Sequence, residues 1–85
     1  MCNHAETNRV EVALFASLSK YNPEGTGNAP FSLEIQPGCT VEEILKGLGL
    51  SADGKLIYVD EQRNDKTFVP PAGAKIAVFP PITGG

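Results

Sequence analysis

The segment TVEEILKGLGL (residues 40–50) has the clearest helical pattern in the chain, and the rest of the fold can be inferred from it. Thr40 can serve as an N-cap, and Glu43 stands three positions later, which is the capping-box pattern. The apolar side chains follow at helical spacing and form one stripe, which consists of Val41, Ile44, Leu45 and Leu48. Gly49 predicts the end of the helix. So short a helix would not persist by itself, and we therefore expect it to lie on a sheet.

Strand patterns lie on both sides of this helix, separated by turns and by a loop rich in Asn, Pro and Gly at residues 20–30. The predicted strands are residues 9–18, 31–35, 55–60, 66–69 and 75–79. This order predicts an α+β domain in which a mixed sheet of four to five strands carries one main helix on one face. The chain divides into a disordered N-terminus, a folded domain and a flexible tail, at residues 1–8, 9–79 and 80–85.

Composition excludes several classes of function. The 85 residues are enough for one small domain, and a net charge of −3 without a basic run argues against nucleic acid as a partner. No apolar run is long enough to cross a membrane or to act as a signal peptide. Cys2 and Cys39 are read as free thiols in a reducing cytoplasm. His4 and Cys2 are too few ligands on a loose end to hold a metal, so we expect none.

The last residues, FPPITGG (residues 79–85), predict a reactive arm. Pro80 and Pro81 cannot donate to a ladder, so the sheet must stop there and the chain must leave in a stiff extended form. Six residues follow Phe79, and an extended segment of that length reaches about 20 Å. Gly84 and Gly85 have no Cβ, so the terminal carboxylate could enter a narrow active site of another protein.

Three stretches together resemble one family. VEVALFASL (residues 10–18), TVEEILKGLGL and AGAKIAVFPPITGG (residues 72–85) are similar to the ubiquitin-like sulfur carriers of the MoaD and ThiS types. The Phe-Pro-Pro lead before Gly-Gly favours the small subunit of molybdopterin synthase (MoaD-type) over the thiamine-type carriers. The resemblance implies the β-grasp fold. Two turns depart from the family pattern: Val59-Asp60-Glu61 stands where Val-Asn-Gly is common, and Gly73-Ala74 stands where Gly-Asp is common.

The resemblance implies a mechanism without catalytic side chains in this chain. An E1-like adenylyltransferase would use ATP to adenylate Gly85, which Gly84 precedes, and a sulfur donor protein would convert the adenylate to a thiocarboxylate. The large subunit of molybdopterin synthase would then accept the tail and pass its sulfur to a pyranopterin precursor. That transfer builds the dithiolene of the molybdenum or tungsten cofactor. The chain itself would bind no cofactor, because ATP belongs to the activating enzyme.

Docking is expected at the base of the tail. If Val10, Val12 and Leu14 face the helix, Phe15 points to the open face of the sheet, and Phe79 likewise opposes Ile76 and Val78. Neighbouring first and last strands would bring the two rings together, unless either ring folds over the edge of the core. The predicted partner-binding residues are Phe15, Phe79, Pro80, Pro81, Ile82 and Thr83.

Two other functions stay open on the sequence. A protein modifier would use the same activation chemistry, but would be joined through Gly85 to lysines of target proteins. A sulfur carrier could also serve another pathway, such as thiamine synthesis. A third hypothesis is a plain interaction domain whose tail is inert.

Overall fold

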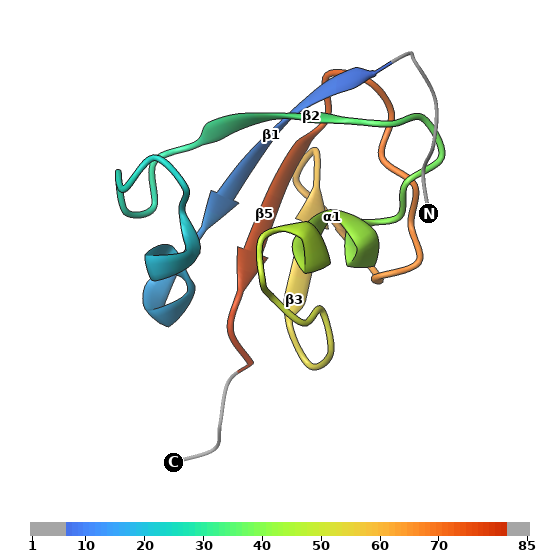
Figure 1. The fold of residues 1–85 in the computed structure, drawn as a ribbon. Coiled ribbons are helices and arrows are strands. Elements are labelled where there is room, and N and C mark those ends of the chain that lie inside the picture. Colours follow the sequence, from blue (N-terminus) through green and yellow to red (C-terminus); the bar gives the residue numbers. More distant parts are fainter. Residues whose placement is uncertain (1–6, 82–85) are drawn as a thin grey trace.

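The computed structural model describes residues 7–81, and the order of elements in that range is that of an α+β domain (Figure 1). The elements are β1 (Asn8–Leu14), the 3-10 helix η1 (Ala16–Tyr21), β2 (Phe31–Ile35), α1 (Val41–Gly47), β3 (Leu56–Val59), β4 (Gln62–Asn64) and β5 (Lys75–Phe79). They form one five-stranded sheet in the order β2-β1-β5-β3-β4. β1 and β5 are parallel at the centre, and the other pairs are antiparallel, which confirms the predicted mixed sheet.

The two faces of this sheet differ because strand side chains alternate. Val10, Val12 and Leu14 of β1 have no exposed surface, and they point with Ile76 and Val78 of β5 towards α1. The helix adds its own buried stripe of Val41, Ile44 and Leu45, whereas Leu48 is half-buried. Figure 1 shows α1 lying across this one face, and we call the opposite face, which no described helix covers, the open face of the sheet.

Local signals set both ends of α1. The Thr40 hydroxyl accepts a hydrogen bond from the Glu43 N–H, and the Glu43 carboxylate accepts one from the Thr40 N–H, so the predicted capping box is present. At the other end the N–H of Leu50 donates to the Leu45 carbonyl, and the N–H of Gly49 donates to Lys46. Gly49 has φ +87°, the left-handed conformation that this Schellman arrangement requires.

The segment predicted as a fourth strand, residues 66–69, is not a strand. It crosses the start of α1, where the carbonyls of Phe68 and Lys66 accept hydrogen bonds from the N–H groups of Val41 and Glu42. The fourth strand is instead β4, which follows β3 through a two-residue turn at Asp60 and Glu61. The prediction was wrong because Gln62–Asn64 has no apolar alternation, so the sequence pattern gave no strand signal there.

Three further details correct the sequence predictions. β1 starts one residue early, because Asn8 pairs with Ile35, and it ends at Leu14. The residues after Phe15 form η1, which extends into the predicted loop as far as Tyr21. Cys39 is disulfide-bonded, so the expectation of a free thiol at that position is wrong, and Cys2 lies outside the described residues. The cytoplasmic location therefore loses the support of the free thiols.

The loop between η1 and β2 is organised by one buried amide. Asn22 is only 6% exposed, and its Nδ2 donates to Thr26 Oγ1 at 2.9 Å and to the Gly27 carbonyl at 2.9 Å. Its Oδ1 accepts from the Glu24 N–H at 2.7 Å. A buried amide with these partners holds the loop in one conformation, because each lost bond would leave a buried polar group unsatisfied.

Candidate functional site

The base of the C-terminal segment lies at the end of the central strand. β5 is hydrogen-bonded on both sides, to β1 and to β3, and its last residue is Phe79. β1 and β5 run in the same direction, so their carboxyl ends meet at one edge of the sheet, where the chain leaves the domain (Figure 1). Beyond Phe79, Pro80 is half-buried and Pro81 is exposed. The exit point is therefore held by two ladders.

Three aromatic side chains gather at this exit, and we call Phe15, Tyr58 and Phe79 the ring cluster. The rings of Phe15 and Phe79 are stacked, with centroids 4.5 Å apart and planes 7° apart. The Tyr58 ring meets Phe79 edge to face, with centroids 5.8 Å apart and an angle of 87°. Both arrangements are favourable for aromatic pairs. Phe79 ends β5, Tyr58 lies on the neighbouring strand β3, and Phe15 directly follows β1 on the other side.

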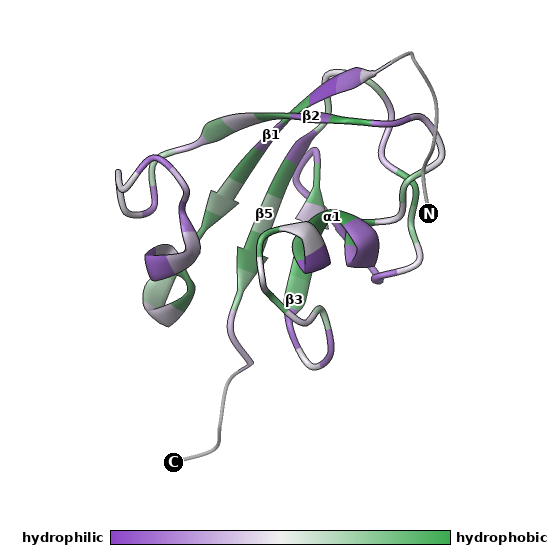
Figure 2. Ribbon diagram, in the orientation of Figure 1, coloured by the Kyte–Doolittle hydropathy of each residue, from purple (hydrophilic) through white to green (hydrophobic). Residues whose placement is uncertain are grey.

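The ring cluster lies on the open face of the sheet. In the described part of the chain, its three rings are half-buried and stand outside the hydrophobic core cluster. The small side chains of Ala13 and Ala77 are paired across β1 and β5 beside them, and Tyr58 is paired with Ala77. Figure 2 shows the same polarity along the central strands, which are hydrophobic towards the exit and hydrophilic at the start of β1 and β5.

The far end of the open face is charged. The Arg9 guanidinium contacts the Glu34 carboxylate at 3.0 Å, and both side chains are exposed. An exposed pair of this kind contributes little to stability. Glu11 of β1 is paired with Lys75 of β5 in the next row of the sheet. The face is therefore apolar beside the exit and charged away from it.

The structure brings together some of the predicted site residues. Phe15 and Phe79 are in direct contact, and Pro80 and Pro81 continue the chain from them. The other four, Ile82, Thr83, Gly84 and Gly85, lie outside the described residues. Tyr58 was missed by the sequence analysis. Its signal was available, since Tyr58 lies between the core residues Ile57 and Val59 on β3 and must face the opposite side.

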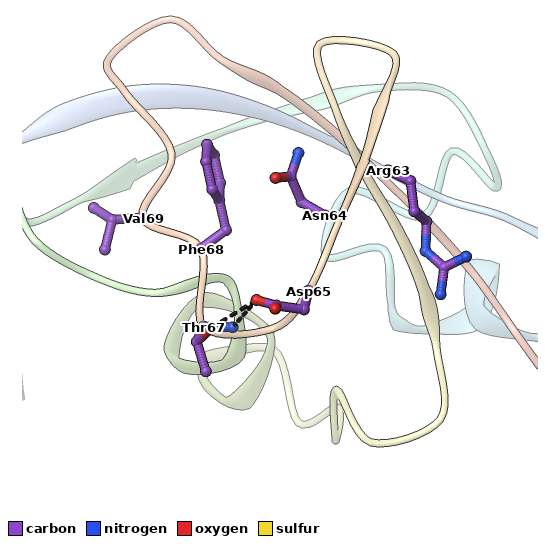
Figure 3. Close-up of a pocket in the computed structure, with 6 residues that line it drawn as sticks. All are labelled: Arg63, Asn64, Asp65, Thr67, Phe68 and Val69. Atoms are coloured by element: carbon purple, nitrogen blue, oxygen red, sulfur yellow. Dashed lines mark hydrogen bonds between the residues drawn. The ribbon is translucent and has the colours of Figure 1, made fainter.

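A concavity lies between β4 and the segment that follows it (Figure 3). Its volume is about 650 Å³, and its lining consists of Arg63, Asn64, Asp65, Thr67, Phe68 and Val69. The Asp65 carboxylate accepts hydrogen bonds from the Thr67 hydroxyl at 2.6 Å and the Thr67 N–H at 3.1 Å. These bonds, the hydroxyl first, lower the pKa of Asp65. The Asp65 carboxylate therefore already has partners within its own turn.

The described residues, 7–81, also bear on two other kinds of site. No group of three or more His, Cys, Asp or Glu side chains in that range could hold a metal ion. No helix in the same range is long and apolar enough to cross a membrane.

Comparisons with known proteins identify the fold. The sequence matches no protein-family model, and it matches none of the curated proteins compared with it. Among solved structures, the small archaeal modifier protein 1 of Haloferax volcanii is similar at a TM-score of 0.68 and 20% identity, over 88% of this chain and 99% of that one. Its counterpart from Methanosarcina acetivorans is similar at 0.63 and 19%, over 95% and 100%.

A third similar structure is the ubiquitin of Caldiarchaeum subterraneum, at a TM-score of 0.60 and 16% identity, over 94% of this chain and 100% of that one. Identities this low show the fold alone. The five-stranded mixed sheet with one helix across one face gives the same result independently. The chain is thus a small α+β protein with the ubiquitin-like β-grasp fold.

Proposed function

We propose that this protein is a sulfur carrier of the MoaD type, whose C-terminal Gly85 is converted to a thiocarboxylate for the synthesis of the molybdopterin dithiolene. One observation carries the proposal: the aromatic ring cluster lies on the open face of the sheet, beside the point where Pro80 and Pro81 begin the segment that ends in Gly-Gly. A partner that docks on this surface has the base of the tail beside its own active site.

The chemistry can be written with all groups balanced. The Gly85 carboxylate attacks the α-phosphorus of ATP and pyrophosphate leaves, which gives an acyl-adenylate. The terminal sulfur of a persulfide on a donor protein attacks the carbonyl carbon, AMP leaves, and an acyl disulfide forms. A thiol then attacks the donor-side sulfur, which releases the thiocarboxylate and leaves the thiol and the donor joined as a disulfide. The protein supplies positioning, which lowers the barrier of each step.

The partners follow from this chemistry. An E1-like adenylyltransferase, a sulfur donor protein and the large subunit of molybdopterin synthase each need access to the tail. We propose that the adenylyltransferase and the large subunit use the ring cluster with Pro80 and Pro81, and that Ile82 and Thr83 line the path of the tail inside the partner. Acid and base groups would come from the partner. We place the reaction in the cytoplasm, where ATP is available.

A second candidate function is a protein modifier joined through Gly85 to lysines of target proteins. The observation that favours it is the similarity to two proteins named small archaeal modifier proteins. Activation of Gly85 is common to both functions, and they differ in the acceptor. Sulfur transfer for thiamine synthesis is a variant of the first function.

The intact mass of the protein isolated from its own cells separates these functions. Replacement of one oxygen by sulfur supports the sulfur carrier, whereas conjugates in which trypsin leaves residues 76–85 (IAVFPPITGG) attached to a target lysine support the modifier. Deletion of Gly85 should abolish either product, while a variant shortened at the N-terminus by Met1 alone is the matched control. A tail that no ATP-dependent enzyme of the same cell activates would refute both.

The Phe15→Ala variant tests docking. The Phe15 ring is half-buried outside the core, so its loss should reduce the free energy of unfolding by about 1 kcal/mol, the value of an aromatic pair. A hot-spot ring contributes about 2 kcal/mol or more to binding, so the dissociation constant of the partner complex should rise ~30-fold. Calorimetric binding and thermal melts measure the two losses. Equal losses in both would count against this docking site.

A further inference from the structure

The ring of Phe79, the last residue of β5, contacts two aromatic side chains outside β5. Phe79 is stacked on Phe15, which follows β1, and it meets Tyr58 of β3 edge to face. The N–H of Phe15 also donates to the carbonyl of Val78 at 3.1 Å, so backbone and ring contacts hold the end of β5 from the same side. These contacts therefore fix Phe79 at the end of β5, where the sheet ends.

The contacts of Phe79 with Phe15 and Tyr58 are not needed to complete the hydrophobic core. In the part of the chain that the structure describes, all three rings lie outside the core cluster, whereas Tyr21, Leu33, Leu48 and Phe68 pack against it. The helix side of the sheet is filled by other residues, such as Ile57 and Val78, which are almost fully buried. The ring cluster thus orders the end of β5 on the open face, where no other element among residues 7–81 covers it.

The two prolines after Phe79 extend the effect of these ring contacts along the chain. Proline fixes its own φ near −65° and restricts the residue before it to extended conformations, so Phe79, Pro80 and Pro81 have few free torsions. We propose that Phe15 and Tyr58 are positioning residues that hold the Phe79 ring and thereby set the direction in which the C-terminal segment leaves the domain. This proposal rests on the proposed function, because the direction matters when Gly85 must reach a reaction centre.

The length of the segment makes its direction important. Pro80 and Pro81 in extended form reach about 7 Å from Phe79, so a change of 10° at Phe79 moves the end of Pro81 by about 1.2 Å. A misplacement of about 1 Å at a reacting group can cost about 100-fold in rate. Loss of the ring contacts with Phe79 should therefore slow the reaction of a docked tail, even where the apolar docking surface is kept.

The test uses leucine, which keeps apolar area but cannot make the two aromatic contacts. In the full-length Phe15→Leu/Tyr58→Leu protein, the Cα–Hα residual dipolar couplings of Pro80 and Pro81 should fall to about half their wild-type values. With ATP and an E1-like adenylyltransferase from the same genome, kcat for adenylation at saturating concentrations of the variant should fall about tenfold. Tyr58→Phe keeps the ring, so it should retain the dipolar couplings of Pro80 and Pro81.

Phe68→Leu is the matched control, because that ring packs against the core on the helix side. It should lower the melting temperature and leave the couplings and kcat unchanged. Unchanged couplings in the double leucine variant, or reduced couplings with unchanged kcat, would overturn the proposal, as would a rise in KM alone. If the enzyme does not adenylate the wild-type chain, the proposed function fails, and the dipolar couplings still decide whether the rings set the exit direction.

Discussion

The turn between β3 and β4 offers a sharp test of backbone strain, through the Glu61→Gly variant. Asp60 and Glu61 have φ values of 51° and 70°, although neither is glycine. Positive φ at both central residues is the geometry of a type I′ turn, which usually carries Asn-Gly or Asp-Gly. Glu61 is exposed, and Asp60 is tied to β5, since its carboxylate accepts from the Lys75 N–H at 3.1 Å. Glu61 is therefore the position to change.

The expected change in the free energy of unfolding is the balance of two opposing effects. A residue with a Cβ loses about 1–2 kcal/mol in the left-handed conformation, and glycine escapes this loss. Glycine also makes the unfolded chain more flexible, which costs about 0.4–1 kcal/mol. We expect Glu61→Gly to raise the free energy of unfolding by about 0.5–1 kcal/mol. In a domain of this size that corresponds to a rise in melting temperature of about 2–8 °C.

Calorimetry and urea unfolding measure this gain, and Glu61→Ala is its control. Alanine removes the same charge but keeps the Cβ, so it should raise the free energy of unfolding much less than glycine does. If alanine stabilises the protein as much as glycine does, charge rather than backbone strain is the cause. If glycine destabilises the protein, the strain at this turn is not stored in the folded state, and the reasoning is refuted.

Three other predictions concern local hydrogen bonds. Asn22→Ala should lower the free energy of unfolding by about 2 kcal/mol in urea titrations, because several bonds to the loop are lost; Asn22→Asp should not restore it, since a carboxylate has no N–H to donate. Thr40→Ala should cost about 1 kcal/mol, whereas Thr40→Ser should cost much less, and equal losses would contradict the cap. The hydrogen bond from the Thr40 N–H lowers the pKa of Glu43, so this carboxylate stabilises the fold above the ordinary carboxyl pKa, and that stability is lost as the pH falls through the lowered pKa. Glu43→Gln should therefore melt with a flatter dependence on acidic pH than the wild type, and an identical slope would exclude this linkage.

The parts of the fold that the sequence could predict depend on short-range signals. The helix was predicted because Thr40, Glu43 and Gly49 act within a few residues of one another, and all three do so in the structure. The central strands were predicted because one face of each is buried, which produces alternation in the sequence. The contact of Phe15 with Phe79 followed from this alternation once β1 and β5 were assumed to be neighbours.

The parts that the sequence could not predict depend on distant partners. β4 is a polar edge strand, and its pairing with β3 comes from a turn whose residues do not have the usual turn composition. Residues 66–69 look like a strand, but their carbonyls are used by the start of α1, which lies more than twenty residues earlier. The alternation in β3 gives the face on which Tyr58 lies, but its contact with Phe79 was missed because that contact depends on β3 lying next to β5, which no local pattern shows.

The central place of β5 has a mechanical consequence for anything that pulls on the C-terminal end. A force along this strand acts parallel to the ladders with β1 and β3, so it loads their hydrogen bonds together in shear rather than one after another. An edge strand such as β4 could be peeled off bond by bond. We therefore expect a higher unfolding force when the domain is pulled by its C-terminal end than when it is pulled from β4. Single-molecule force spectroscopy with these two pulling geometries would measure the difference.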